Sequence, residues 1–161
     1  MLRTALLACV LAAGFTSAAS AAMVEYSASL NGASEVPPKQ TAGIGDLLAT
    51  LDTTKKELIY TLTFEGLSGP ATAAHFHGPA AAGANAGVAV PIGGKDPTSP
   101  VHGSATLTDA QIKDLEAGKW YVNVHTAANP GGEIRGQVMS AKQGSMPMKS
   151  MPMKAMPAKT Q

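Results

Sequence analysis

Cysteine is almost absent from this chain, and its one copy lies in a segment that we expect to be removed. Cys9 is the single cysteine among 161 residues. It lies in the apolar stretch 5–18, which follows Arg3 and precedes the small residues 19–21, the order typical of a secretory signal peptide. Residues 1–22 are therefore predicted to be cleaved, and the mature protein then has neither a disulfide nor a thiolate metal ligand.

Long apolar runs are lacking as well. A membrane span needs about 20 apolar residues, more than the stretch 5–18 offers. We therefore expect no transmembrane segment in the mature protein and a periplasmic or secreted location. A lipoprotein cleavage box around Cys9 is the lesser alternative, because cutting there would leave almost no apolar core in the signal.

Acidic residues are absent from the C-terminal end. Residues 140–161 contain four lysines and no acid, whereas residues 23–139 contain seven Lys and Arg against eleven Asp and Glu. A mildly acidic folded part argues against nucleic acid as a partner. The change of composition divides the mature chain into a folded domain over 23–139 and a tail over 140–161.

Aromatic side chains make up only 4% of the sequence, so Val, Leu, Ile and Ala must form most of the core. Short runs of alternating apolar and polar residues predict strands, and Gly, Pro, Asn and Asp separate them. These runs are 24–30, 45–51, 57–64, 71–77, 101–107, 120–126 and 133–139. Short strands with frequent turns favour an all-β fold, either a β-sandwich or a Greek-key barrel.

One short helix is predicted over 109–117. Thr108 and Gln111 have the spacing of a capping box at its start, and Gly118 can end it. The segment 78–100 is rich in Gly, Ala and Pro and is predicted to be a loop, long enough for a functional role.

All four histidines lie between His75 and His125. His75 and His77 flank Phe76 in a predicted strand, where side chains at i and i+2 share a face about 6.5 to 7 Å apart along the chain. His125 and His102 also fall at strand positions that face away from the core. Because imidazole is the commonest metal ligand, this grouping favours a metal site over the alternative of four unrelated surface histidines.

Ligand type narrows the metal to copper or zinc. Both metals suit imidazole ligands, and copper stands above zinc in divalent affinity. We therefore predict copper, with zinc as the second choice. Glu35 could add a carboxylate near such a site, but its place in a Pro-rich turn predicts a solvated side chain.

The tail carries a five-residue repeat in which methionine and proline alternate. Its methionines are Met146, Met148, Met151, Met153 and Met156. Proline in every unit prevents a regular helix or a central strand, so the tail is expected to be disordered. Thioether sulfur is a soft ligand that selects Cu(I), which favours copper capture over the alternative of an inert linker.

Several motifs resemble those of the CHRD domain, named after chordin and widespread in bacterial secreted proteins. They are Leu-Asn-Gly-Ala-Ser-Glu-Val-Pro-Pro at 30–38, Ala-His-Phe-His-Gly-Pro-Ala at 74–80, Tyr-Val-Asn-Val-His-Thr at 121–126 and Pro-Gly-Gly-Glu-Ile-Arg-Gly-Gln at 130–137. The resemblance covers roughly 24–139. It implies an immunoglobulin-like or superoxide dismutase-like β-sandwich in a family with no generally established catalytic activity, several of whose bacterial members look like metal-binding proteins.

The order of the histidines is also similar to that of copper-zinc superoxide dismutase. By that likeness His75, His77 and His125 would hold copper and His102 would take the place of the bridging histidine. Arg135 would resemble the arginine that guides superoxide. The chain departs from that family in having no disulfide and no evident set of zinc ligands.

Together these features lead to three hypotheses. The first is a periplasmic copper-binding protein for copper tolerance, storage or delivery, with another periplasmic copper protein as the partner that delivery would require. The second is a copper-only superoxide dismutase-like enzyme. The third is a metal-free adhesion or interaction module in which the histidines are incidental.

Overall fold

A computed structural model describes residues 22–141 of the chain. Residues 1–21 of the predicted signal peptide and the five tail methionines lie outside these residues. Among the residues described, no helix is long and apolar enough to cross a membrane.

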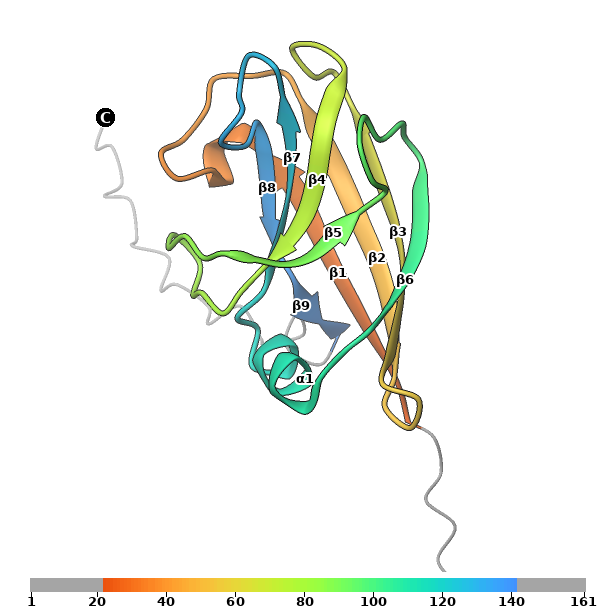
Figure 1. The fold of residues 1–161 in the computed structure, drawn as a ribbon. Coiled ribbons are helices and arrows are strands. Elements are labelled where there is room, and N and C mark those ends of the chain that lie inside the picture. The colour runs from red at the N-terminus through yellow and green to blue at the C-terminus, as the bar shows by residue number, and fades with distance from the viewer. Residues whose placement is uncertain (1–21, 142–161) are drawn as a thin grey trace, which may run out of the picture.

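The described chain forms one antiparallel sheet that curls into a nearly closed barrel or sandwich, with one short helix (Figure 1). The elements are β1 (Met23–Asn31), the 3-10 turn η1 (Gly32–Ser34), β2 (Ile44–Asp52), β3 (Glu57–Glu65), β4 (Ala71–His77), β5 (Val88–Ile92), β6 (Val101–Thr106), α1 (Asp109–Glu116), β7 (Tyr121–Thr126), β8 (Ile134–Gln137) and β9 (Met139–Ser140). The strand order is β5-β4-β7-β8-β1-β2-β3-β6, with β9 paired to β1. The predicted all-β fold with one helix is confirmed.

The seven predicted strands are all present, but the segment 78–100 is not the uninterrupted loop that its composition predicted. It contains β5, which ends the strand order beside β4. Pro91 lies within this strand, and an edge strand tolerates proline because its missing N–H faces away from the sheet. The last predicted strand is also divided, since Val138 separates β8 from β9.

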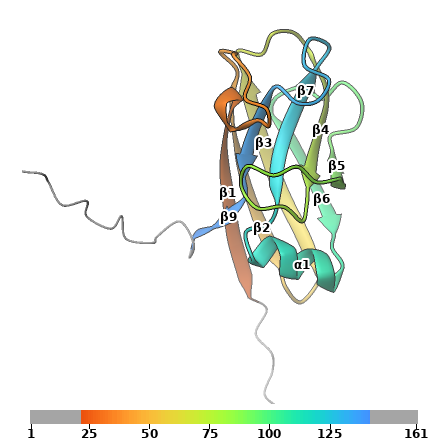
Figure 2. The ribbon, with the colours of Figure 1, turned by 90° about the vertical axis from the view of Figure 1, so that its left-hand side faces the viewer.

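The helix α1 lies across the lower end of the barrel in both views (Figures 1 and 2). Its predicted capping box is present: the Thr108 side chain accepts a hydrogen bond from the Gln111 backbone and Gln111 bonds back to Thr108. Leu115 is the residue by which the helix enters the core, and it is fully buried. Gly118 follows with a φ of 67°, a left-handed conformation that glycine adopts without strain.

Aliphatic side chains fill most of the core, as their abundance predicted. A small aromatic group supplements them: the ring centroids of Phe76 lie 5.3 Å from Tyr60 and 5.7 Å from Trp120. Phe76 faces this core from β4, so its neighbours His75 and His77 face the other side of the sheet.

The outer face of the sheet at β4, β7 and β8 is covered rather than solvated. All six residues of β7 are buried, although the core takes only Val122 and Val124 from the alternating face. Loop segments 84–86 and 129–130 bond to side chains of this outer face. A second, polar layer therefore lies outside the hydrophobic core, and it contains three of the four histidines.

Candidate metal centre

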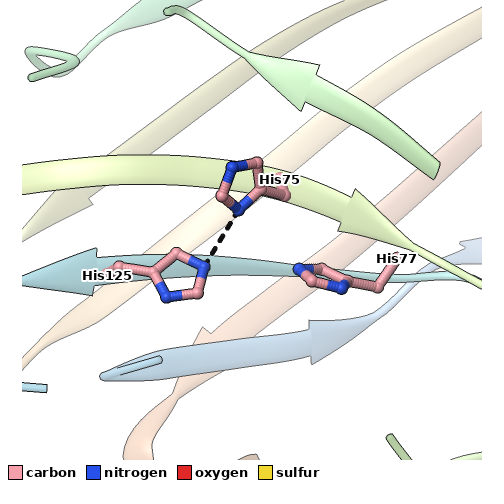
Figure 3. A group of neighbouring side chains, drawn as sticks. All are labelled: His75, His77 and His125. Atoms are coloured by element: carbon pink, nitrogen blue, oxygen red, sulfur yellow. Dashed lines mark hydrogen bonds between the residues drawn. The ribbon is translucent and has the colours of Figure 1, made fainter. Parts of the chain in front are cut away.

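Three of the four histidines come together on this outer face. His75 and His77 project from β4 and His125 from the adjacent strand β7 (Figure 3). Each histidine offers one ring nitrogen to the group, and these three nitrogens all lie within 4.8 Å of one another. The i, i+2 spacing on β4 therefore places two imidazoles side by side, and the strand pairing with β7 supplies the third.

Backbone carbonyls fix which nitrogen of two of these rings is free. His77 Nδ1 lies 3.0 Å from the Ala86 carbonyl oxygen and His125 Nδ1 lies 3.0 Å from the Pro130 carbonyl oxygen. Because a carbonyl only accepts, each Nδ1 carries the proton and each Nε2 keeps its lone pair. This is the arrangement by which proteins orient metal-binding histidines.

The free nitrogens face the shared space of the cluster. His77 Nε2 is buried and has no hydrogen-bond partner among the residues described. His125 Nε2 lies 3.0 Å from His75 Nδ1 (Figure 3), where the His75 N–H donates to it. A metal ion bound here would replace that hydrogen bond and would also satisfy the His77 nitrogen, so the residues present fit a metal with three nitrogen ligands.

The surroundings favour the neutral form of two of the rings, those of His75 and His125. Burial, followed by the charges that His125 and His77 would carry, lowers the pKa of His75. Burial also lowers the pKa of His125. The hydrogen bond to the Pro130 carbonyl raises this pKa, and the charge that His77 would carry lowers it further. Neutral imidazole is the form that binds metal. His77 and His125 are buried and His75 is half-buried, so the cluster opens to solvent on the side of His75.

The model of the CHRD domain matches residues 26–138, which is most of the chain. This chain belongs to the CHRD domain family. No curated protein and no solved structure matches it at a level that would establish a relationship. The resemblance seen in the sequence motifs is thereby confirmed for the CHRD family, while the likeness to copper-zinc superoxide dismutase rests on the order of the histidines alone.

His102, the fourth predicted ligand, is not part of the cluster in this CHRD domain. It lies on β6, opposite Thr61 of β3, and its Nδ1 is 3.0 Å from the Thr61 hydroxyl. Its side chain is exposed there. The five tail methionines lie outside the described part of the CHRD protein, so their relation to the cluster stays a prediction.

Arg135 does not stand at a site entrance, as its likeness to a superoxide-guiding arginine implied. It is only 2% exposed, because its guanidinium lies over the ring of Tyr121 and donates to the Asn85 side chain and the Ala84 carbonyl. The loop that makes these contacts covers it. Its burial does not fit the exposed position that this likeness implied.

Glu35 is likewise buried rather than solvated, at 5% exposure, and its Oε1 has no hydrogen-bond partner in the described chain. Burial raises the pKa of this carboxyl, although the Arg135 charge and the Val36 N–H act in the opposite direction. The local sequence does not indicate this burial, because the groups that act on the Glu35 carboxyl include Asn123 and Arg135, which are distant in sequence. Glu35 is not a member of the three-histidine group.

Proposed function

We propose that this CHRD domain protein is a periplasmic copper-binding protein that serves copper tolerance, storage or delivery. The observation that carries the proposal is the meeting of three imidazoles, one of which has a buried nitrogen without a partner among the described residues. A set of ligands made only of imidazole suits copper or zinc, and copper binds such sites more tightly among divalent metals. No carboxylate or thiolate belongs to the group, so nothing in it favours a harder metal.

The tail supports copper over zinc by a separate argument. Met146, Met148, Met151, Met153 and Met156 offer thioether sulfur, which binds Cu(I) and has little affinity for zinc. In this proposal the tail captures Cu(I) at low affinity and passes it to the histidines or to another periplasmic copper protein.

Metal handling is favoured over catalysis by the position of Arg135. A dismutase that draws in a small anion needs an accessible cation near its metal, and the candidate cation is covered by the loop 84–86. The half-buried His75, by contrast, gives a bound ion a route for exchange with solvent or a partner.

The test is a Cu(II) titration of the mature protein against a competing chelator, followed by metal analysis. Cu(II) reports on the histidines because the tail thioethers prefer Cu(I). We expect one tightly bound Cu(II) per chain, which is lost in the variant His75→Ala/His77→Ala. His102→Ala is the matched control and should retain the ion, since His102 lies apart from the cluster.

Each alternative has its own outcome in this experiment. If the folded protein binds neither Cu(II) nor, with its tail methionines replaced by leucine, Cu(I), the copper function is wrong and the metal-free module remains. If the copper-loaded protein dismutates superoxide well above free copper, the enzyme hypothesis replaces storage and delivery.

A further inference from the structure

A positive charge is stacked behind one of the three histidines. The guanidinium carbon of Arg135 lies 3.4 Å from the centroid of the Tyr121 ring. The imidazole of His77 lies parallel to the same ring, at 4.8 Å between centroids and 3° between planes. Because β7 runs between β8 and β4, the tyrosine ring separates the cation from the candidate ligand.

One loop segment holds all three members of this stack in place. Arg135 Nη1 lies 2.9 Å from Asn85 Oδ1 and its Nη2 donates to the Ala84 carbonyl. The Tyr121 hydroxyl and His77 Nδ1 both bond to the Ala86 carbonyl oxygen, at 3.2 and 3.0 Å. The guanidinium therefore has a fixed position relative to the ring that would bind metal.

Arg135 forms no salt bridge within the described residues. The buried carboxyl of Glu35 interacts with its charge, but burial raises the pKa of Glu35 and so favours the neutral acid. The salt bridges within residues 22–141 all involve lysines, and the hydrogen-bond partners of Arg135 are neutral. A buried cation without a directly paired anion acts on its surroundings more strongly than an exposed one, because water screens it less.

We propose that Arg135 makes the three-histidine site favour Cu(I) over Cu(II). A fixed positive charge repels a doubly charged ion twice as strongly as a singly charged one. At a separation on the order of 10 Å and an effective dielectric constant of about 20, this difference changes the ratio of the two affinities roughly tenfold. The inference rests on the proposed copper function and adds to it the oxidation state that the site retains.

The test compares Cu(I) and Cu(II) affinities, each by chelator competition, in the full mature protein. The five tail methionines are replaced by leucine in every variant, so that Cu(I) binding reports on the histidines. In Arg135→Gln we expect tighter Cu(II) binding and a roughly tenfold fall in the preference for Cu(I). Arg135→Lys keeps the charge and should keep most of the preference.

A second variant leaves the arginine in place and neutralises it. Asn85→Asp puts a carboxylate oxygen where the amide oxygen now accepts from the guanidinium, 2.9 Å away. It should shift the affinity ratio in the same direction as Arg135→Gln, so the test does not depend on one substitution being tolerated.

The sign of the change separates an effect of charge from an effect of structure. Loosening the His77 ring would weaken the binding of Cu(I) and Cu(II) alike. Removing a repulsive charge would instead strengthen the binding of Cu(II) more than that of Cu(I). The inference would be overturned if the affinity ratio were unchanged in both Arg135→Gln and Asn85→Asp. It would also be overturned if both variants bound Cu(I) and Cu(II) more weakly by the same factor. In either case the copper function would stand. A wild-type protein without copper binding would overturn both.

Discussion

At the scale of single residues, the most heavily hydrogen-bonded carboxylate of the protein is Glu133, which is fully buried. It accepts hydrogen bonds from the hydroxyls of Thr41, Ser68 and Thr126, from the Ser68 backbone and from the Asn129 amide. Burial acts to raise its pKa, but these hydrogen bonds outweigh it and lower the pKa of Glu133 from 4.5 to about 2. The segments around 41, 68 and 129 are thereby joined at one end of the barrel.

This lowered pKa predicts how stability depends on pH. Since the folded-state pKa of Glu133 lies below its unfolded value, its ionisation stabilises the fold above about pH 4.5, and that contribution is lost as the pH falls toward 2. The shift corresponds to about 3 kcal/mol. We expect Glu133→Gln to lower the free energy of unfolding at pH 7 by an amount of that order and to flatten its fall between pH 5 and 2, as measured by urea titration. Glu25→Gln, at an exposed position on β1, is the control and should behave as wild type.

A second pH dependence concerns the proposed copper site. The pKa values of His75 and His125 are both lowered, so protons begin to compete with a metal only below the ordinary histidine value of about 6.5. We expect Cu(II) affinity to be nearly constant from pH 7.5 to 6.5 and to fall steeply by pH 5. Competition titrations at these three values provide the measurement.

Cu(I) capture by the methionines should respond differently. Thioether sulfur does not take up a proton in this range, so we expect a synthetic peptide of residues 142–161 to bind Cu(I) equally well at pH 7 and pH 5. A parallel loss of affinity in the peptide and in the histidine cluster would contradict the division of roles between them.

At the scale of elements, hydrogen bonds to Ala86 bind the loop before β5 to the sheet. The Tyr121 hydroxyl accepts from the Ala86 N–H and donates to the Ala86 carbonyl, both at 3.2 Å. Tyr121→Phe removes these bonds and keeps the ring. We expect a loss of about 1 kcal/mol in the free energy of unfolding and faster hydrogen exchange at residues 84–86. Tyr26→Phe is the matched control: its buried hydroxyl has no partner in the described chain, so removing it should cost nothing or stabilise the protein.

The strands that carry the histidines were predictable, because alternation along 71–77 and 120–126 places all three of them opposite the core residues. The covering of that face was not. Arg135 and Asn85 are 50 positions apart, and no local pattern indicates that a Gly- and Ala-rich segment will fold back over β7. The sequence did not predict the burial of Glu35 and Arg135, nor the strand β5, for the same reason. Each of these features depends on contacts between residues that are distant in sequence.

At the scale of the whole molecule, the last described element shows where the fold ends. Ser140 of β9 is buried and pairs with Tyr26 of β1, so a truncation that spares the fold must begin after Ala141 rather than at residue 140. We expect deletion of residues 142–161 to leave the thermal midpoint and Cu(II) binding unchanged while Cu(I) capacity falls. A large drop in the midpoint would show that the tail packs against the domain. Scanning calorimetry of both forms makes the comparison.

The family and the all-β architecture follow from the motifs between 30 and 137, and both are confirmed. The number of histidines in the cluster does not follow from them. His102 occupies a strand position like that of His125, and only the strand order shows that β6 and β7 belong to different parts of the sheet.

The histidines lie on the side of the sheet that the hydrophobic core does not use. Replacing them therefore changes the polar layer and leaves untouched the packing of Phe76, Val122 and Val124. Under the proposed function, folding and metal binding depend on different faces of the same two strands. A proposed metal site of this kind could therefore be removed by substitution without unfolding the domain, so the outward-facing positions of β4 and β7, rather than the core pattern, are where metal binding has to be read.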